Sequence, residues 1–367
     1  MPTHHHNPHP LIIDGHNDTV LRFYGAELLG IELPSFFEKN SVTHIDLPRA
    51  RAGGLGGGFF AMYTPNEVKW PDEDAEPGAG EDESAETNYQ TPLPPMVDHN
   101  FALKVTFGMM RKLLAWEKES DGQIKIVRNS AELAHCLKNG IFGIIMHIEG
   151  AEAIDENFDS LHIFHQVGLR SIGPVWSRPT IFGHGVPFNF PDTPDIGDGL
   201  TDLGKQLIRE CNQLNILVDL SHLNLKGFRD VAAISTAPLV CTHSGAHAMA
   251  ASPRNLLDEQ LDAIKATNGV TGINYHVPFL RQDGRRTIKT SVTEIVRHVA
   301  YVADRIGVEH VALGSDFDGA KMPDDLVDVA GQPRIIAALH AHGFNEVEIS
   351  KIAHGNWLRV LSDTWGS

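Results

Sequence analysis

Five separate segments of this 367-residue chain each end a short apolar run with a residue type that commonly binds metals. They span residues 12–18, 144–150, 217–222, 239–243 and 311–316. A short apolar run that stops at His, Asp or Glu is typical of a buried parallel strand with a polar side chain at its carboxyl end. Because parallel strands that share a sheet or barrel end on the same face, we expect these polar side chains to meet there.

Strand-like runs alternate with helix-like runs along most of the sequence. The pattern predicts strands over residues 11–14, 57–63, 141–148, 171–175, 216–220, 239–242, 270–274 and 311–314. It predicts helices over residues 158–167, 203–214, 256–266 and 292–306, and a closing pair of short helices over 346–350 and 351–361. The alternation indicates an α/β fold, and about eight such units favour a TIM-like (β/α)8 barrel, with the metal site at the C-terminal ends of its strands. An open doubly wound sheet is the alternative, but no G-x-G-x-x-G follows the first strand.

The sequence is expected to form one domain. Residues 1–10 contain neither a basic segment nor an apolar one, so they predict a disordered N-terminal tail and not a secretory signal. Residues 11–367 are expected to form a single barrel domain with an acidic insertion at about 66–92. Its most acidic part, 71–83, indicates a passive solvated loop, and a lid over the active site is the alternative.

Charge and cysteine content exclude several classes of protein. The 30 Lys and Arg against 47 Asp and Glu give a formal net charge of −17, which disfavours nucleic acid and anionic membranes as partners. No apolar run approaches the roughly 18 to 20 residues that span a bilayer. The three widely spaced cysteines, Cys136, Cys211 and Cys241, do not suggest disulfides, so a cytoplasmic location is expected.

The candidate ligands follow from their places at the strand ends. His16 and Asp18 are two residues apart, so both point to the same side of an extended backbone. Glu149 is costly to bury unless it is paired or binds metal, and its two oxygens can bridge two ions; a helix cap is the alternative. His222 and His243 end successive predicted strands and should be neighbours.

Asp316 ends the last strong strand, where it can contact a metal and accept a proton from the attacking water. A bound metal brings the pKa of that water towards about 7, so a nearby carboxylate suffices as the base. Three His, two Asp and one Glu suit a pair of divalent metals, and zinc fits these ligand types best. The sequence therefore predicts a metal-dependent hydrolase.

Short motifs of the chain resemble the membrane (renal) dipeptidase family of zinc peptidases, in particular its cytoplasmic bacterial members. The similarity runs from Asp14 to about Leu361, and its most specific parts are residues 14–18, 148–150, 219–222, 242–244, 253–255 and 314–319. It implies a TIM-like barrel with two zinc ions and, as is common in that family, a homodimer.

The resemblance also implies a role for each candidate residue. The implied ligands are His16 and Asp18 on one zinc ion, His222 and His243 on the other, Glu149 bridging both, and Asp316 on the first. Asp316 would also act as acid and base on the bridging water, so Asp316 and Glu149 are the expected catalytic residues. Arg254 would hold the carboxylate of the substrate, a role suited to its bidentate guanidinium.

One position departs from the family pattern. A His that stabilises the developing oxyanion is typical there, and the best match in this chain is Trp176, which donates only one N–H and cannot become a cation. His184, in a Gly-flanked loop, could enter the site or be merely structural. His276 follows another predicted strand and could line the substrate pocket.

The expected function is therefore a binuclear zinc dipeptidase that hydrolyses dipeptides, including those with a C-terminal D-residue, by a metal-bridging water. Its expected partner is a small dipeptide substrate, and neither nucleic acid nor a membrane. Two alternatives stay open. The same site could act on another small amide, such as an N-acyl amino acid or a lactam, as Trp176 and the loop 180–191 suggest. The chain could also be a catalytically silent metal-binding protein.

Overall fold

The computed structural model describes residues 10–67, 87–286 and 289–366. Its strands are β1 Ile12–Asn17, β2 Leu55–Tyr63, β3 Ile124–Ile126, β4 Phe142–Glu149, β5 Leu169–Gly173, β6 Leu217–Val218, β7 Val240–Cys241, β8 Val270–Ile273 and β9 Val311–Leu313. Its α-helices are α1 Thr19–Leu29, α2 Leu47–Ala52, α3 His99–Glu119, α4 Ser130–Asn139, α5 Asp159–Val167, α6 Asp202–Leu214, α7 Leu225–Ile234, α8 Asp258–Ala266, α9 Val277–Leu280, α10 Thr293–Ile306, α11 Pro333–His342, α12 Glu346–Ser350 and α13 Asn356–Trp365.

The strands expected from the apolar runs are all present, and the short β3 is an addition that pairs with β4. The predicted helices correspond to α5, α6, α8 and α10. At the C-terminus the chain forms α12 and α13 with a π-helical segment, Lys351–Gly355, between them, where two helices were expected. The expected tail up to residue 9 and the acidic stretch 71–83 lie outside the described residues.

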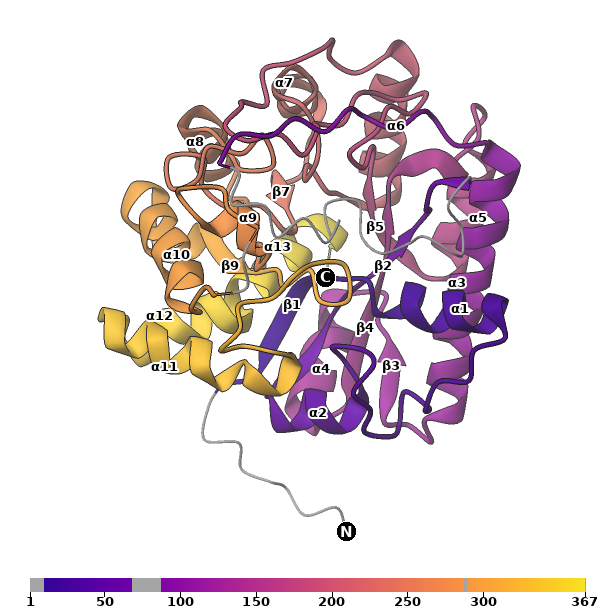
Figure 1. Ribbon diagram of the computed structural model, residues 1–367. Coiled ribbons are helices and arrows are strands. Elements are labelled where there is room, and N and C mark those ends of the chain that lie inside the picture. Colours follow the sequence, from indigo (N-terminus) through magenta and orange to yellow (C-terminus); the bar gives the residue numbers. More distant parts are fainter. Residues whose placement is uncertain (1–9, 68–86, 287–288, 367) are drawn as a thin grey trace.

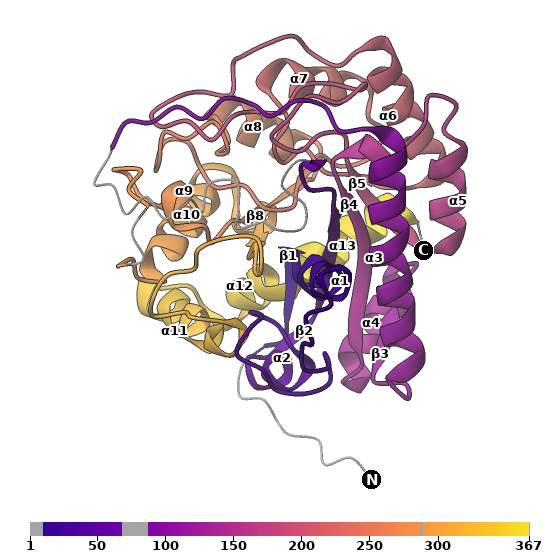
Figure 2. The ribbon, with the colours of Figure 1, turned by 45° about the vertical axis from the view of Figure 1, so that its right-hand side comes forward.

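All the strand pairs between these elements are parallel, which confirms the α/β architecture. One sheet has the order β1-β2-β4-β5-β6, and a second has the order β7-β8-β9. Single parallel bridges join Asp219 to Val240 and Asn17 to Phe317, so the two sheets adjoin at both edges. The first sheet is curled, as in a TIM-like fold, with α3 and α4 on its outer side (Figure 2). Closure into a complete barrel stays a prediction, because the two joins are single bridges.

Alternation along the strands separates two layers of apolar side chains. An inner cluster joins one side of the strands to α13: Ile13, Phe59, Ile145, Leu217, Val240, Val270, Ala312, Trp357, Val360 and Leu361. The adjacent residues Ile12, Phe60 and Ile144 belong instead to the outer cluster, which packs against the helices. Side chains of the strands and of α13 pack together in this cluster, so the space between them is a filled core and not a pore. Helix α13 appears near the centre of the view in Figure 1.

Two glycines allow β1 and β9 to approach the residue before His243. A Cβ atom on Gly15 or Gly314 would lie 2.3 or 2.0 Å from the carbonyl oxygen of Thr242, which is far inside van der Waals contact. Asp14 also joins these strands, since its carboxylate accepts hydrogen bonds from the backbone N–H and the hydroxyl of Ser315, at 2.6 and 2.8 Å. The two strand ends are thereby held beside each other.

Within the described ranges, no helix combines the length and the apolar character that a membrane span requires.

Candidate metal centre

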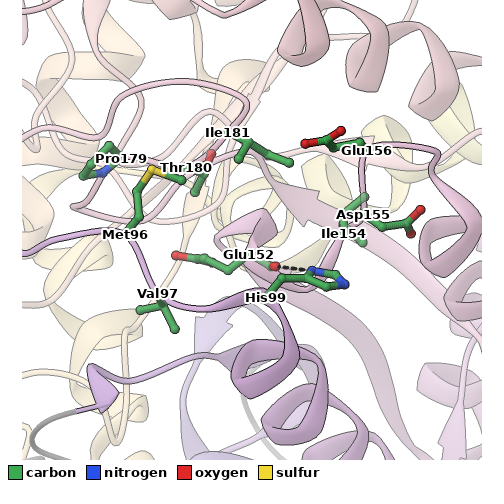
Figure 3. Close-up of a pocket in the computed structure, with 10 residues that line it drawn as sticks. All are labelled: Met96, Val97, His99, Glu152, Ile154, Asp155, Glu156, Pro179, Thr180 and Ile181. Atoms are coloured by element: carbon green, nitrogen blue, oxygen red, sulfur yellow. Dashed lines mark hydrogen bonds between the residues drawn. The ribbon is translucent and has the colours of Figure 1, made fainter.

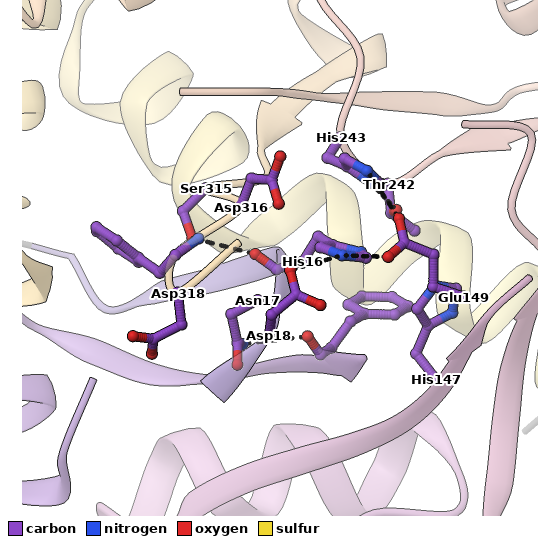
Figure 4. A network of polar contacts seen from close by, with 12 residues as sticks. His16, Asn17, Asp18, His147, Glu149, Thr242, His243, Ser315, Asp316 and Asp318 are labelled. Carbon is purple, nitrogen blue, oxygen red and sulfur yellow. Dashed lines mark hydrogen bonds and ion pairs between the residues drawn. The ribbon is translucent and has the colours of Figure 1, made fainter. Parts of the chain in front are cut away.

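The six candidate ligands lie together at the carboxyl ends of the strands. Figure 4 shows five of them, all except His222. They come from both sheets: His16 from β1, Asp18 just after it, Glu149 from the end of β4, and His222, His243 and Asp316 from the segments after β6, β7 and β9. Five of them are at most 5% exposed, and Asp316 is partly exposed. The structure therefore gathers the set that the strand-end pattern predicted, although whether these residues ligate metal stays a proposal.

Glu149 occupies the centre of the cluster. Its Oε2 lies 3.6 Å from Nε2 of His16, and its Oε1 lies 3.0 Å from Nε2 of His222 and 3.3 Å from Nε2 of His243. The same His16 nitrogen is 3.6 Å from the Asp18 carboxylate. Ligands about 2.0–2.1 Å from a tetrahedral zinc ion are about 3.3 Å apart, so these separations fit donors around metal ions.

Several buried polar atoms of the cluster have no hydrogen-bond partner in the part of the chain that the structure describes. They include both ring nitrogens of His16 and Oδ1 of Asp18. The Nε2 atoms of His222 and His243 also face each other at 3.1 Å, an arrangement in which two unprotonated nitrogens repel. Burying such atoms unpaired is costly, and a cation between them removes the cost. The donor set therefore fits a metal centre.

Hydroxyl groups hold the outer nitrogens of two imidazole rings. Nδ1 of His222 lies 2.7 Å from Oγ of Ser177, and Nδ1 of His243 lies 2.8 Å from Oγ1 of Thr242. The Thr242 hydroxyl donates to Asp219 at 2.5 Å, so it accepts the proton of His243. Fixing the outer nitrogen directs Nε2 towards the centre, which is how metal-binding histidines are commonly oriented.

The pKa shifts agree with a cluster that requires positive charge. Burial alone would lower the pKa of His16, but the carboxylates of Glu149 and Asp18 raise it well above its ordinary value. Burial raises the pKa of Asp316 to about 7, with Asp18 and Glu149 adding to the effect against the influence of His16. Burial lowers the pKa of His222 to about 4, which keeps that ring in the neutral form that binds metals.

Two candidate ligands have an unusual backbone conformation. His222 and Asp316 have φ angles of 65° and 62°, in the left-handed region that residues with a side chain rarely adopt. Each such residue costs of order 1–3 kcal/mol, and these conformations cluster at functional sites. The strain supports a functional role for both residues.

The predicted substrate-binding residues lie at different distances from the cluster. Arg254 is 3% exposed, donates from Nη2 to the backbone oxygen of His243 at 3.2 Å, and stacks 5.5 Å from the ring centre of Phe279. Its Nε has no hydrogen-bond partner within the described residues and could bind a carboxylate. His276 packs against the same Phe279 ring at 4.6 Å. Arg254 therefore contacts the backbone of a candidate ligand, and His276 is connected to Arg254 through the Phe279 ring.

Trp176 lies close to the cluster, with its ring centre 5.8 Å from that of the candidate ligand His222. It also contacts Tyr63 at 5.0 Å and Phe188 at 5.4 Å, and so forms part of an aromatic wall. His184 is placed differently. Its backbone oxygen accepts from Asn224, and across the described residues no hydrogen bond or ion pair connects its ring to the cluster.

Sequence reasoning missed two residues that contact the candidate ligands. Asn274 donates from Nδ2 to Oδ2 of Asp316 at 2.9 Å, and Ser177 contacts His222 as described above. Asn274 directly follows β8, so the strand-end rule could have found it. Ser177 lies in a loop, and no local pattern distinguishes it.

A separate pocket of about 280 Å³ lies between the start of α3 and the loops after β4 and β5 (Figure 3). It is lined by Met96, Glu152, Ile154 and Thr180, among others, and by none of the six candidate ligands. The pocket is therefore distinct from the metal centre.

A parallel α/β fold that gathers buried histidines and carboxylates at its strand ends is typical of metal-dependent hydrolases. The comparison with known families agrees and is more specific. The chain belongs to the membrane dipeptidase family, peptidase family M19, which it matches over residues 5–365. It is accordingly a member of a family of metallopeptidases that act as dipeptidases.

Relatives and solved structures support this assignment. An uncharacterized protein in the pqqA 5′ region of Klebsiella pneumoniae is 45% identical over 70% of this chain and 94% of its own length. Dipeptidase tcpJ of Claviceps purpurea is 27% identical over 95% of this chain and 76% of its own length. A metallo peptidase from Rhodobacter sphaeroides, solved with a phosphinate mimic of the dipeptide L-Ala-D-Ala, superposes with a TM-score of 0.91. That structure is 46% identical and matches 97% of this chain and 100% of its own.

Proposed function

We propose that the protein is a binuclear zinc dipeptidase that hydrolyses dipeptides, including those with a C-terminal D-residue. The observation that carries this proposal is the position of Glu149, with one oxygen beside His16 and the other beside His222 and His243. A carboxylate so placed suits two ions and not one. The L-Ala-D-Ala mimic bound to the 46% identical Rhodobacter protein supports the substrate class.

In this proposal His16, Asp18 and Asp316 would hold the first ion, His222 and His243 would hold the second, and Glu149 would serve both. When bound, the two ions supply Lewis acidity to the scissile carbonyl and lower the pKa of the attacking water. The chain's own residues supply the remaining chemistry.

Asp316 is placed to move the proton of the reaction. Its Oδ2 accepts a hydrogen bond from Asn274, which leaves its other oxygen for the water and fixes the carboxylate plane. It would take a proton from the attacking water and give it to the leaving amine. Arg254 would bind the free carboxylate through its unpartnered Nε, which restricts substrates to short peptides.

The test is a panel of L,L and L,D dipeptides with zinc-loaded protein, with and without a chelator. We expect cleavage that is abolished by the chelator and reduced at least 100-fold in Asp316→Asn, with zinc still bound in that variant. Two zinc ions per chain should be found by elemental analysis. A protein that binds one ion, or an Asp316→Asn variant with full activity, would contradict the proposed mechanism.

A second candidate is hydrolysis of another small amide at the same site, such as an N-acyl amino acid or a lactam. Trp176 favours this alternative, because loss of one oxyanion donor can cost on the order of 10²–10³ in rate. N-acyl amino acids in the same panel separate the two, since turnover of these alone would replace the dipeptidase proposal. Zinc binding with no turnover of any substrate would indicate a silent member.

Three further parts of the proposal rest on the family resemblance and the sequence. They are closure of the strands into a TIM-like (β/α)8 barrel, a homodimer, and a cytoplasmic location. The two single bridges between the sheets support the first of these.

A further inference from the structure

Arg178 is a fully buried cation near the proposed active site, and the proposed reaction gives it no role. Its side chain is 0% exposed and makes three contacts through its guanidinium. Nε donates to Oε1 of Glu152 at 2.5 Å, Nη1 donates to Asn66 at 2.9 Å, and Nη2 donates to the backbone oxygen of Thr64. Every nitrogen of the fork is therefore used.

The same guanidinium also lies over two of the neighbouring aromatic rings, those of Trp176 and Tyr63. Its carbon lies 5.2 Å from the ring centre of Trp176 and 5.4 Å from that of Tyr63. A guanidinium stacked on two rings, and fixed in its own plane by three hydrogen bonds, holds both rings at defined positions. Trp176 thus has a cationic neighbour that is itself held in place by hydrogen bonds.

The backbone around Arg178 is tied to the segment that carries His222. Its N–H donates to the Trp176 oxygen at 2.7 Å, which closes a tight turn over Ser177. A Cβ atom on Gly185 would lie 1.8 Å from that oxygen, so the next loop packs directly on the turn. In that loop the N–H of Val186 donates to the His222 oxygen at 2.8 Å. The turn and the candidate ligand are therefore packed as one unit.

We infer that Arg178 is a positioning residue, which fixes the turn of Trp176 and Ser177 and thereby orients His222 in the metal centre. The Ser177 hydroxyl, at 2.7 Å from Nδ1 of His222, is the link between the turn and the ring. This inference rests on the proposed function, since it assumes that His222 binds a metal. Glu152 balances the buried charge and lies between Arg178 and the pocket of Figure 3.

The test compares Arg178→Lys with Arg49→Lys. Arg49, in α2, is a matched control: it is 6% exposed, pairs with Asp46 at 2.5 Å and Asp328 at 2.8 Å, and makes no hydrogen bond to a candidate ligand. Lysine keeps the charge in both variants but loses the planar fork. A double variant, Arg178→Met with Glu152→Met, removes both buried charges. It replaces Arg178→Lys in the test if the lysine variant folds poorly.

The readouts are metal affinity by competition with a chelator and the visible spectrum of the cobalt-substituted protein, followed by kcat and KM. We expect Arg178→Lys and the double variant to lose about 10–100-fold in affinity for one of two ions, with a changed cobalt spectrum. Arg49→Lys should lower the Tm but leave both readouts unchanged.

The inference is overturned if the Arg178 variants have a lower Tm but an unchanged metal affinity and cobalt spectrum. It is also overturned if Arg49→Lys changes the metal affinity and the cobalt spectrum as much as the Arg178 variants do. Failure of the proposed function would appear separately, as wild-type protein that binds two ions but cleaves no dipeptide, or that does not bind two ions.

Discussion

At the scale of single residues, the candidate ligands make hydrogen bonds to neighbours that do not belong to the candidate metal centre. The Thr242 hydroxyl accepts a hydrogen bond from Nδ1–H of His243 and donates one to the Asp219 carboxylate. Thr242→Val keeps the shape of the side chain and removes this link. Because such supports typically contribute 10–100-fold to metal affinity or activity, we expect a loss of that size, measured by chelator competition.

The control for that variant is Thr106→Val. Thr106 is also fully buried, and its hydroxyl has no hydrogen-bond partner in the described part of the chain. Removing that hydroxyl should leave metal binding unchanged and stability equal or higher. Equal metal affinity in Thr242→Val and wild-type protein would show that His243 does not depend on the hydroxyl.

A substitution at Gly319 should disturb the proposed site of the first ion and leave the site of the second ion intact. A Cβ atom there would lie 2.0 Å from Oδ2 of Asp18 and 2.8 Å from Oδ1 of Asp316. Gly319→Ala must therefore displace both carboxylates, and we expect elemental analysis to find one ion per chain in place of two. Gly355→Ala meets nothing closer than 3.4 Å and should retain two. Two tightly bound ions in Gly319→Ala would contradict the assignment of these carboxylates to the first ion.

The gathering of the candidate ligands could be predicted from the sequence because each follows an apolar run, and the fold brings the ends of those runs together. The residues that orient the candidate ligands could not be predicted in the same way. Ser177 and Arg178 act through a turn whose position depends on Gly185 and on the loop after it. Such contacts arise from packing between loops, and no periodicity in the sequence records them.

At the scale of elements, the apolar runs predicted where strands occur better than how long they are. The run 216–220 yields only Leu217–Val218 as β6, and 239–242 yields only Val240–Cys241 as β7. Parallel bonding nevertheless continues past both strands, since the N–H of Leu220 donates to the oxygen of Val240 and the N–H of Ser244 donates to the oxygen of Gly272. The apolar runs therefore follow the parallel pairing more closely than they follow the assigned strands.

Helix α7 depends on a buried cap beside the metal centre. Oδ1 of Asn224 accepts from the N–H of Gly227 at 2.9 Å, while Nδ2 donates at 2.6 Å to the oxygens of both Ile196 and Asp198. Asn224→Ala removes the cap and leaves two carbonyls unpaired. We expect a loss of roughly 2–4 kcal/mol in the free energy of unfolding, measured by urea denaturation.

Asn129, which caps α4 through one hydrogen bond from Glu132, provides the comparison. Asn129→Ala should cost only about 1 kcal/mol, as is usual for a simple cap. If both variants lose the same amount, the two bonds from Asn224 to the 196–198 loop contribute nothing to stability.

At the scale of the whole molecule, buried neutral histidines make stability depend on pH. His298, in α10, is 0% exposed; Nδ1 accepts from the N–H of Ala246 at 3.0 Å and Nε2 donates to the oxygen of Leu280 at 3.0 Å. Burial lowers the pKa of His298 from 6.5 to about 4. Both nitrogens are used only when the ring is neutral, so the folded protein resists its protonation.

The sign of the effect follows from proton binding. Between pH 6.5 and about 4 the unfolded chain protonates this ring and the folded chain does not, so acid favours unfolding. Stability is therefore lost as the pH falls through this window, by roughly 3 kcal/mol over its whole width. Urea denaturation of metal-free protein at pH 7.5, 6.5, 5.5 and 4.5 should show the decline, and His298→Gln should show a smaller one. Metal-free protein is required because protons also compete with metals for the ligands. Parallel curves for the two proteins would mean that His298 accepts a proton in the folded state, and that the loop from Gly245 to Leu256 rearranges to allow it.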